Sequence, residues 1–454
     1  MTSIHKNDVL EGKIEYIKFP NKAVFKFEEQ DVIVKGGLIG QIVKARVIKK
    51  RKGKIEARIL EVIENSPYEK KSLCPHFDVC GGCTYQNLRY KEQLKLKQDQ
   101  VKGILDNVID YKYKFYSIEP SPTEYGYRNK MEFSFGDEVK GGELTLGLHK
   151  SCSMYDVITT SNCQIVDKDY RKIISVVLNF FKKLKYDYFN KKTHIGYLRH
   201  LIIRKASKTN EIMINLVTTS QSDTDFDYFV DKLLNIKLDG AIVSILHTLN
   251  DSISDVVKPD RIDILYGRDY IVEEILGLKF KISPFSFFQT NSLAAEKLYS
   301  IVKGFTGFTN DKIIFDLYAG TGTISQIIAV VAKKVYGIEI IEEAAEIARE
   351  NAKENGLKNC EFISGDIVKK LDDLKDEPHV IIIDPPRPGI HPKAIEQIIN
   401  FDAEHIIYVS CNPITLANDI KIFQENGYDV EKVQCVDMFP HTPHVETVVK
   451  LSAN

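Results

Sequence analysis

The sequence has no apolar run long enough to cross a membrane. A helix needs roughly 20 consecutive apolar residues to span a bilayer, and no segment of the 454-residue chain approaches that length. The first residues, MTSIHKNDVLEG, also lack the apolar stretch of a signal peptide. We therefore expect no membrane association and a cytoplasmic location.

The chain has almost no net charge, and it lacks internal repeats and low-complexity tracts. It holds 62 Lys and Arg against 63 Asp and Glu, a formal charge of −1 that taken alone argues against a nucleic-acid partner. A hydrophobic fraction of 43% and a charged fraction of 28% exclude a disordered or fibrous chain. At about 150 residues per domain, the length predicts about three domains.

The charge is spread unevenly along the chain. Residues 1–54 hold 13 basic and 6 acidic residues, a net of +7, whereas residues 286–454 hold 16 basic and 25 acidic residues, a net of −9. A basic module joined to an acidic one is typical of a nucleic-acid-binding appendage on a catalytic domain. A basic strand edge that prevents aggregation would explain the N-terminal charge equally well.

Residues 9–64 alternate apolar and polar side chains in five short runs separated by glycines. Period-two strands of this length favour a small OB-like barrel that binds oligonucleotides. The run Lys49-Lys-Arg-Lys-Gly-Lys54 would form a hairpin that contacts phosphates.

Three of the eight cysteines, Cys74, Cys80 and Cys83, fall within ten residues. In a chain expected in the cytoplasm, such a group indicates a metal site rather than a disulfide framework. The surrounding part of the chain reads as a mixed α/β region, with a helix over 87–107, strands over 130–135 and 200–204, and a helix over 173–184.

From about residue 290 the pattern becomes regular. Helices are predicted over 293–304, 324–332, 342–355 and 414–426, and strands over 312–316, 335–339, 380–384 and 405–410. Strands that alternate with helices of this length predict a parallel, doubly wound sheet, which binds ligands at the carboxyl ends of its strands.

Candidate ligand-binding residues follow several of these strands. Asp316 opens a glycine loop, Glu339 ends the next strand where its carboxylate can accept both hydroxyls of a ribose, and Asp366 and Asp384 follow later. Ser325 replaces the third glycine of the dinucleotide fingerprint, which argues against NAD. Each feature alone is an ordinary turn, but together they favour a Rossmann-like class I methyltransferase fold.

Cys411 is the candidate nucleophile. It follows the strand 405–410, and Pro413 suits the first turn of the next helix, whose dipole would stabilise a thiolate. Most free cysteines are small buried apolar residues, which we expect of Cys360 and Cys435. Glu446, in His444-Val-Glu446-Thr, could face the same pocket as a general base.

These motifs together resemble the RNA uracil-C5 methyltransferase family, specifically its iron–sulfur-containing 23S ribosomal RNA branch. The resemblance covers nearly the whole chain and includes an N-terminal TRAM module, the cysteine group, Ser283-Pro-Phe-Ser-Phe-Phe-Gln289, Asp316-Leu-Tyr318-Ala-Gly-Thr-Gly, Asp384-Pro-Pro-Arg387 and Ser410-Cys411-Asn-Pro. It implies three domains: a TRAM barrel over 1–65, a central α/β domain with the iron–sulfur segment over 66–285, and a methyltransferase domain over 286–454.

The resemblance also implies the cofactors and their residues. A 4Fe–4S cluster would take the thiolates of Cys74, Cys80, Cys83 and the distant Cys163, with Cys152 as the local competitor for the fourth place. S-adenosylmethionine and the adjoining base would contact Gln289, Tyr318, Glu339 and Asp384. Asp366 is added from the general methyltransferase pattern, and Thr323 departs from the Asn of some relatives.

The implied reaction is methylation of uridine carbon 5 through a covalent adduct. Cys411 would add to carbon 6, and Glu446 would remove the proton from carbon 5 so that the cysteine leaves. The RNA is expected to be 23S ribosomal RNA, with transfer RNA as the alternative, and no obligate protein partner is expected. Arg128, Lys130 and the barrel would hold phosphates.

Two other classes of protein share some of these features. A radical methylthiotransferase also joins a TRAM module to an iron–sulfur cluster, but its cluster uses Cys-x3-Cys-x2-Cys, whereas the first gap here holds five residues. A non-enzymatic RNA-binding protein would have no need for Cys411, Glu446 and Asp384 together.

Overall fold

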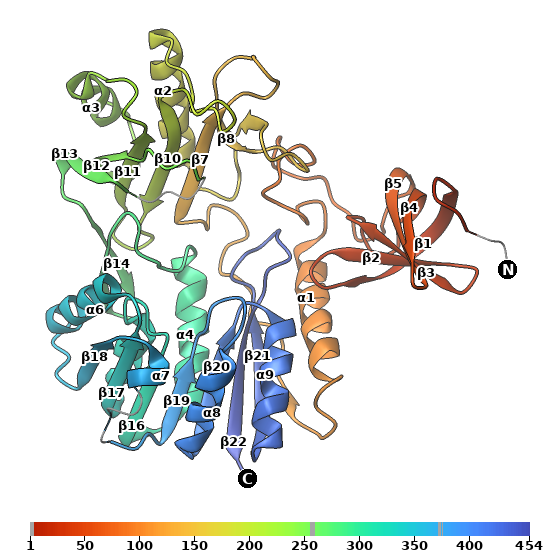
Figure 1. The fold of residues 1–454 in the computed structure, drawn as a ribbon, viewed down its shortest axis with the longest axis vertical. Coiled ribbons are helices and arrows are strands. Elements are labelled where there is room, and N and C mark those ends of the chain that lie inside the picture. Colours follow the sequence, from red (N-terminus) through yellow and green to blue (C-terminus); the bar gives the residue numbers. More distant parts are fainter. Residues whose placement is uncertain (1–3, 255–258, 371–373, 375) are drawn as a thin grey trace.

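The computed structural model describes residues 4–254, 259–370, 374 and 376–454. Four β-sheets organise this part of the chain: a closed N-terminal barrel, a central sheet of seven strands, a two-stranded hairpin and a C-terminal sheet of eight strands (Figure 1). No helix in these ranges is long and apolar enough to cross a bilayer.

The N-terminal barrel confirms the alternating pattern of residues 9–64. Its strands, in the order β1-β2-β3-β5-β4, are β1 Val9–Lys18, β2 Lys22–Phe27, β3 Gln30–Lys35, β4 Ile42–Arg51 and β5 Lys54–Glu64. Strand β1 pairs with both β2 and β4, which closes the barrel and leaves no open edge. The inward positions, Ile14, Phe25 and Val43 among them, are completely buried, and the basic β4–β5 hairpin is exposed.

The central sheet has the strand order β13-β12-β11-β10-β7-β8-β9. Its elements are β7 Lys130–Gly136, β8 Thr145–His149, β9 Val157–Thr159, α2 Lys168–Leu184, β10 Leu198–Lys205, β11 Glu211–Thr218, α3 Phe226–Leu234, β12 Ala241–Leu249 and β13 Arg261–Gly267. Helix α2 begins where the Asp167 side chain accepts a hydrogen bond from the Asp169 N–H, and it buries residues at helical spacing, such as Ile173, Val177 and Phe181. This region is α/β, as expected.

The C-terminal sheet begins after the hairpin of β14 Ile271–Ile275 and β15 Leu278–Ile282, and its order is β18-β17-β16-β19-β20-β22-β21-β6. Its strands are β16 Thr309–Leu317, β17 Ala332–Glu339, β18 Cys360–Ser364, β19 Val380–Ile383, β20 His405–Ser410, β21 Tyr428–Val436, β22 Glu446–Ala453 and β6 Lys114–Phe115. The helices are α4 Ser292–Thr306, α5 Thr323–Ala329, α6 Glu342–Glu354, α7 Ile367–Lys370, α8 Pro392–Asn400 and α9 Pro413–Glu425.

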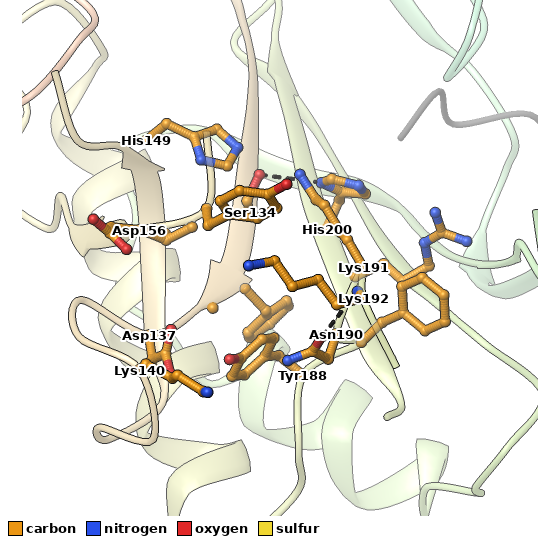
Figure 2. A pocket seen from close by; sticks show the side chains of 16 residues that line it. Ser134, Asp137, Lys140, His149, Asp156, Tyr188, Asn190, Lys191, Lys192 and His200 are labelled. Carbon is orange, nitrogen blue, oxygen red and sulfur yellow. Dashed lines mark hydrogen bonds between the residues drawn. The ribbon is translucent and has the colours of Figure 1, made fainter. Parts of the chain in front are cut away.

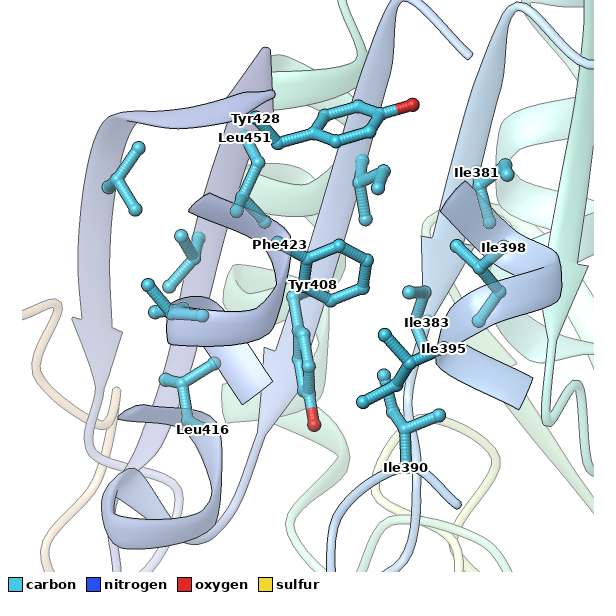
Figure 3. Close-up of a cluster of buried hydrophobic side chains, with 14 of the residues drawn as sticks. Ile381, Ile383, Ile390, Ile395, Ile398, Tyr408, Leu416, Phe423, Tyr428 and Leu451 are labelled. Carbon is cyan, nitrogen blue, oxygen red and sulfur yellow. The ribbon is translucent and has the colours of Figure 1, made fainter. Parts of the chain in front are cut away.

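Strands β18, β17, β16, β19 and β20 run parallel to one another, and the alternating pattern predicted all of them except β18. All four residues of β19 are completely buried, because helices cover both faces of a sheet of this kind. Figure 3 shows Ile395 and Ile398 of α8 and Phe423 of α9 packed over one face. Buried residues of α4 and α5 belong to the core on the other face.

One predicted helix is shorter than expected. The pattern gave a helix over 324–332, but α5 ends at Ala329 and β17 begins at Ala332, where it pairs with Thr309. The β-branched Val330 and Val331 have little helix preference, so the sheet pairing determines the boundary.

Helix α1, Tyr90–Leu105, lies against the C-terminal sheet although it precedes the central sheet in the sequence. Its Val101 and Leu105 are completely buried in the same core as Phe423, and β6 pairs with β21 at the sheet edge. The domain boundaries after residues 65 and 285 remain a prediction.

Candidate active site and cysteine cavity

The carboxyl ends of the parallel strands bring most of the candidate residues to one edge of the C-terminal sheet. Tyr318 follows β16, Glu339 ends β17, Asp384 follows β19 and Cys411 follows β20. Glu446 reaches the same edge for a different reason. It begins β22, which runs antiparallel to β20 and pairs Thr447 with Ser410.

The loop after β16 has the backbone that its glycines permit. Gly320 and Gly322 have φ angles of 56° and 74°, and a Cβ atom on Gly322 would lie 2.5 Å from the Phe362 ring. Tyr318 is in the left-handed region as well, with φ 67°, a conformation that costs a non-glycine residue energy. The loop is therefore held in a tight turn that leaves space beside Gly320.

The Glu339 carboxylate is fixed beside this loop. Its Oε2 accepts a hydrogen bond from the Gly320 N–H over 2.9 Å, and its Oε1 accepts one from the Ile341 N–H over 2.9 Å. Each oxygen keeps a further lone pair for a ligand hydroxyl.

Ser325, which stands where a dinucleotide-binding loop has its third glycine, is completely buried. Its hydroxyl donates a hydrogen bond to Asp316 Oδ2. Close packing between helix and strand is provided instead by Gly337 of β17, because a Cβ atom there would lie 2.9 Å from Ser325 Oγ. Ser325 therefore holds the Asp316 side chain, and it is Gly337 that allows helix α5 to pack closely against strand β17.

Two carboxyl groups at this edge have raised pKa values. Burial raises the pKa of Asp316 to about 7, with a smaller contribution from Asp384, and burial raises the pKa of Asp384 to about 7. The buried Oδ1 of Asp316 has no hydrogen-bond partner among the described residues. A ligand with a positive charge would favour ionisation of both groups.

The other residues proposed for the cofactor lie in different surroundings. Asp366 is exposed, and its Oδ1 accepts a hydrogen bond from the Val368 N–H at the start of α7. Gln289 is half-buried and lines a small pocket together with Lys130 and Arg204. Their contacts with a ligand remain a prediction.

Cys411 lies between β20 and α9, as the sequence predicted. Asn412 caps the helix by accepting a hydrogen bond from the Ile414 N–H, and Pro413 occupies the first turn. Burial, followed by the charges of Glu446 and Asp384, raises the pKa of the Cys411 thiol to about 11, and Arg387 opposes this shift. Burial and two neighbouring carboxyl groups therefore oppose the thiolate that the helix N-terminus is expected to stabilise.

Glu446 is buried, and burial together with Asp384 raises the pKa of its carboxyl group to about 8, against the opposing charge of Arg387. The Arg387 carbonyl accepts hydrogen bonds from Asn412 Nδ2 and Thr415 Oγ1 at 3.1 and 3.3 Å. Sequence reasoning gave Arg387 no role. The signal was present in Asp384-Pro-Pro-Arg387, where two prolines end the strand and place Arg387 beside the start of α9.

The cysteines of the 74–83 group share a small cavity with the distant Cys163, and Cys152 is exposed and does not line it. Burial raises the pKa of Cys83 to about 12 and of Cys163 to about 11. The structure thus brings together the four thiols that the resemblance implied.

No three His, Cys, Asp or Glu side chains in the described ranges lie close enough to hold a single metal ion. A 4Fe–4S cube differs from a single ion because each of its thiolates binds a separate iron, so the sulfurs lie farther apart. Four cysteine thiols that line one cavity are a donor set that such a cluster can use.

A further pocket lies on the central sheet (Figure 2). It contains none of the candidate residues and is lined by basic, aromatic and acidic side chains, including Lys140, Lys191, Lys192, Tyr155, Tyr188, Asp137 and Asp156.

Comparison with known proteins gives consistent results. The family model described as tRNA (Uracil-5-)-methyltransferase matches residues 89–454. An uncharacterized RNA methyltransferase of Clostridium tetani is 52% identical, over 99% of this chain and 98% of its own length. One of Caldanaerobacter subterraneus subsp. tengcongensis is 50% identical, over 98% of each chain. The crystal structure of Pyrococcus abyssi tRNA (uracil-54, C5)-methyltransferase in complex with S-adenosyl-L-homocysteine superposes with a TM-score of 0.78 and 27% identity, over 97% of this chain and 100% of that one.

Proposed function

The chain belongs to the tRNA (uracil-5-)-methyltransferase family, and we propose that it methylates carbon 5 of a uridine in 23S ribosomal RNA through a covalent bond to Cys411. RNA uracil-C5 methylation with S-adenosylmethionine is the activity of the family and of the solved neighbour. The observation that carries the proposed mechanism is the meeting of Cys411 and Glu446 beside the glycine loop, at one edge of a class I methyltransferase sheet.

The cofactor would be held by Gln289, Tyr318, Glu339, Asp366 and Asp384. When bound, S-adenosylmethionine supplies a methyl group on a positively charged sulfonium. The fixed Glu339 carboxylate would accept the ribose hydroxyls. The buried carboxyl groups of Asp316 and Asp384 would favour a cation in the same space.

Cys411 would activate the base. Carbon 5 of uracil is a weak nucleophile until a thiolate adds to carbon 6, which breaks the double bond between carbons 5 and 6 and leaves an enolate. Because the resting thiol has a raised pKa, its proton must leave as the base enters. Arg387 is the neighbour whose charge favours the thiolate.

Glu446 would complete the reaction. Once carbon 5 carries the methyl group, its remaining proton must be removed so that the double bond re-forms and the bond from carbon 6 to sulfur breaks. With a pKa of about 8, the ionised carboxylate is a stronger base than an ordinary carboxylate, and it becomes available as the pH rises through that value.

The RNA would be held by the N-terminal TRAM barrel and by Arg128 and Lys130. The exposed β4–β5 hairpin carries the basic run Lys49–Lys54. Burial and the charges of Arg204 and Arg128 lower the pKa of Lys130 to about 8, and phosphate would relieve this repulsion. The target uridine must leave its stack, at a cost of a few kcal/mol that is smallest in a loop.

The iron–sulfur cluster is proposed on Cys74, Cys80, Cys83 and Cys163, which line one cavity. It would be a closed cluster because four thiols are available for its four irons. The cysteine group is also the reason for preferring ribosomal RNA as the substrate.

Transfer RNA is the second candidate substrate. It is favoured by the solved neighbour, which is a tRNA (uracil-54, C5)-methyltransferase. The two substrates differ in where 5-methyluridine forms, so mapping it in 23S ribosomal RNA and transfer RNA from cells with and without the gene separates them.

Purified protein with S-adenosylmethionine and unmodified RNA tests the mechanism. We expect 5-methyluridine from the wild type and none from Cys411→Ala. Glu446→Gln should form a protein–RNA adduct that survives denaturing electrophoresis, because addition proceeds and elimination does not. Turnover by Cys411→Ala would rule out the nucleophile, and absence of the adduct in Glu446→Gln would count against the base.

A further inference from the structure

Residues 437–445 connect β21 to β22 and lead directly into Glu446. Glu446 is the first residue of β22, so the sheet holds the chain on its C-terminal side, where Thr447 pairs with Ser410. On its N-terminal side the chain leaves the sheet. We call residues 437–444 the base turn, because what holds this turn determines how the Glu446 carboxylate enters the site.

The segment that leaves the cysteine cavity holds the base turn through its backbone. The N–H groups of Thr84 and Tyr85 both donate hydrogen bonds to the His441 carbonyl, over 2.8 and 2.9 Å. Cys83, which lines the cavity, is the residue immediately before Thr84. Two consecutive peptide groups thus connect the cysteine cavity to the turn.

Gln93 of α1 holds the same residue with its side chain. Gln93 is completely buried, and its Oε1 accepts a hydrogen bond from the His441 N–H over 2.9 Å. Its amide nitrogen lies 3.2 Å from His441 Nδ1 and donates to the carbonyls of Tyr85 and Leu88. The Gln93 amide therefore joins helix α1 to the residues that follow Cys83 and to the base turn.

Further hydrogen bonds hold the part of the base turn that precedes His441. Lys97 Nζ donates to Asp437 Oδ1 over 2.6 Å and to the Phe439 carbonyl over 3.0 Å. The Tyr127 hydroxyl donates to the Pro440 carbonyl over 2.9 Å. His441 has a φ angle of 68°, which persists in a non-glycine residue only where its surroundings fix it.

We infer that residues 84–97 form a clamp that positions Glu446, with Gln93 as its positioning residue. Through this clamp, a disturbance of the cysteine cavity changes the position of the catalytic base. The inference rests on the proposed role of Glu446. A base displaced by about 1 Å can lose up to about a hundredfold in rate. We therefore expect the clamp to act on elimination from the adduct, the step for which Glu446 is the base.

Gln93→Met tests the positioning role, because methionine keeps the length of the side chain and removes its hydrogen bonds. We expect the adduct to break down about ten to a hundred times more slowly than in the wild type, so that it accumulates as in Glu446→Gln. Hydrogen exchange of the Thr84, Tyr85 and His441 amides should accelerate. Gln93→Asn, which withdraws the amide by one methylene, should show the same effects to a smaller degree.

Gln100→Met is the matched control. Gln100 lies on the same helix, and its amide nitrogen donates a hydrogen bond to the Ile17 carbonyl of the N-terminal barrel over 2.8 Å, with no hydrogen bond to the base turn among the described residues. We expect its adduct to break down at the wild-type rate. If Glu446→Gln traps the adduct but both Gln93 variants break it down at the wild-type rate, the positioning role of Gln93 is wrong and the role of Glu446 stands. If Glu446→Gln traps no adduct, the proposed role of Glu446 is itself contradicted.

Cys83→Ser tests the link to the cysteine cavity without an activity measurement. We expect faster hydrogen exchange at Thr84 and Tyr85 together with faster exchange through residues 437–444. Unchanged exchange in the base turn, with faster exchange at residues 80–83, would overturn transmission from the cavity.

Discussion

Lys97 Nζ lies 2.6 Å from Asp437 Oδ1, and neither side chain is more than 1% exposed. The pair joins α1 to the end of β21, across 340 residues of sequence. A buried ion pair gains little over an apolar pair of the same shape, but the loss of one partner leaves an uncompensated charge in the core. Its structural importance is therefore tested by removing one partner.

We expect Lys97→Met to destabilise the protein by about 3–5 kcal/mol, because Asp437 would remain buried without its cation. The measurement is the midpoint of denaturant unfolding, followed by near-ultraviolet circular dichroism. Lys95→Met is the control, since Lys95 pairs with Asp99 on the exposed face of the same helix and should cost less than about 1 kcal/mol. Equal effects of the two substitutions would contradict the structural role of the buried pair.

The breakdown of the adduct should accelerate as the pH rises through about 8. Burial and the neighbouring Asp384 raise the pKa of Glu446 from its usual 4.5 to about 8, so the carboxyl group stays protonated below that pH and cannot accept a proton. Rapid-quench measurements between about pH 6 and pH 9.5 would show the rise. Glu446→Asp should retain a rise with pH at a lower rate. A breakdown rate that is constant from pH 6 upward would show that another group is the base.

Purified protein should be brown with visible absorption from an iron–sulfur cluster, and Cys80→Ser should lose that colour and its iron. Cys152→Ser is the matched control, since Cys152 is exposed and does not line the cavity. Full colour in Cys80→Ser, or colour lost only in Cys152→Ser, would contradict the proposed ligand set.

The pattern of apolar and polar residues predicted many of the strands and helices, but it did not predict the pKa values of the site residues. The barrel and the parallel strands β16 to β20 follow from period-two alternation and from apolar runs between helices. The sequence predicted a helix dipole that stabilises the Cys411 thiolate, whereas burial in the folded chain raises the pKa of the thiol. The sequence indicates a helix after Cys411, but it does not show that Glu446 and Asp384 approach the thiol in a buried site.

Groups contributed by distant segments were missed for the same reason. Arg387 lies in a motif that was recognised, yet its contact with Cys411 depends on how the chain turns after β19. Gln93 and Lys97 read as ordinary polar positions of an amphipathic helix. Their burial follows from the packing of α1 against the C-terminal part of the chain, which no local pattern encodes.

The sequence by itself indicated the family through its motifs, and it predicted the barrel strands, four parallel strands of the C-terminal sheet and the residues that follow them, because these depend on periodicity, turn-forming residues and motifs close together in the chain. Only the tertiary structure decided which of those residues meet. It brought Cys163 to the cavity of Cys74, Cys80 and Cys83, and it brought Glu446 to Cys411 through an antiparallel last strand. The physical reason is that burial and charge act through space, so the acidity of a side chain and the rigidity of a turn depend on neighbours far away in the sequence.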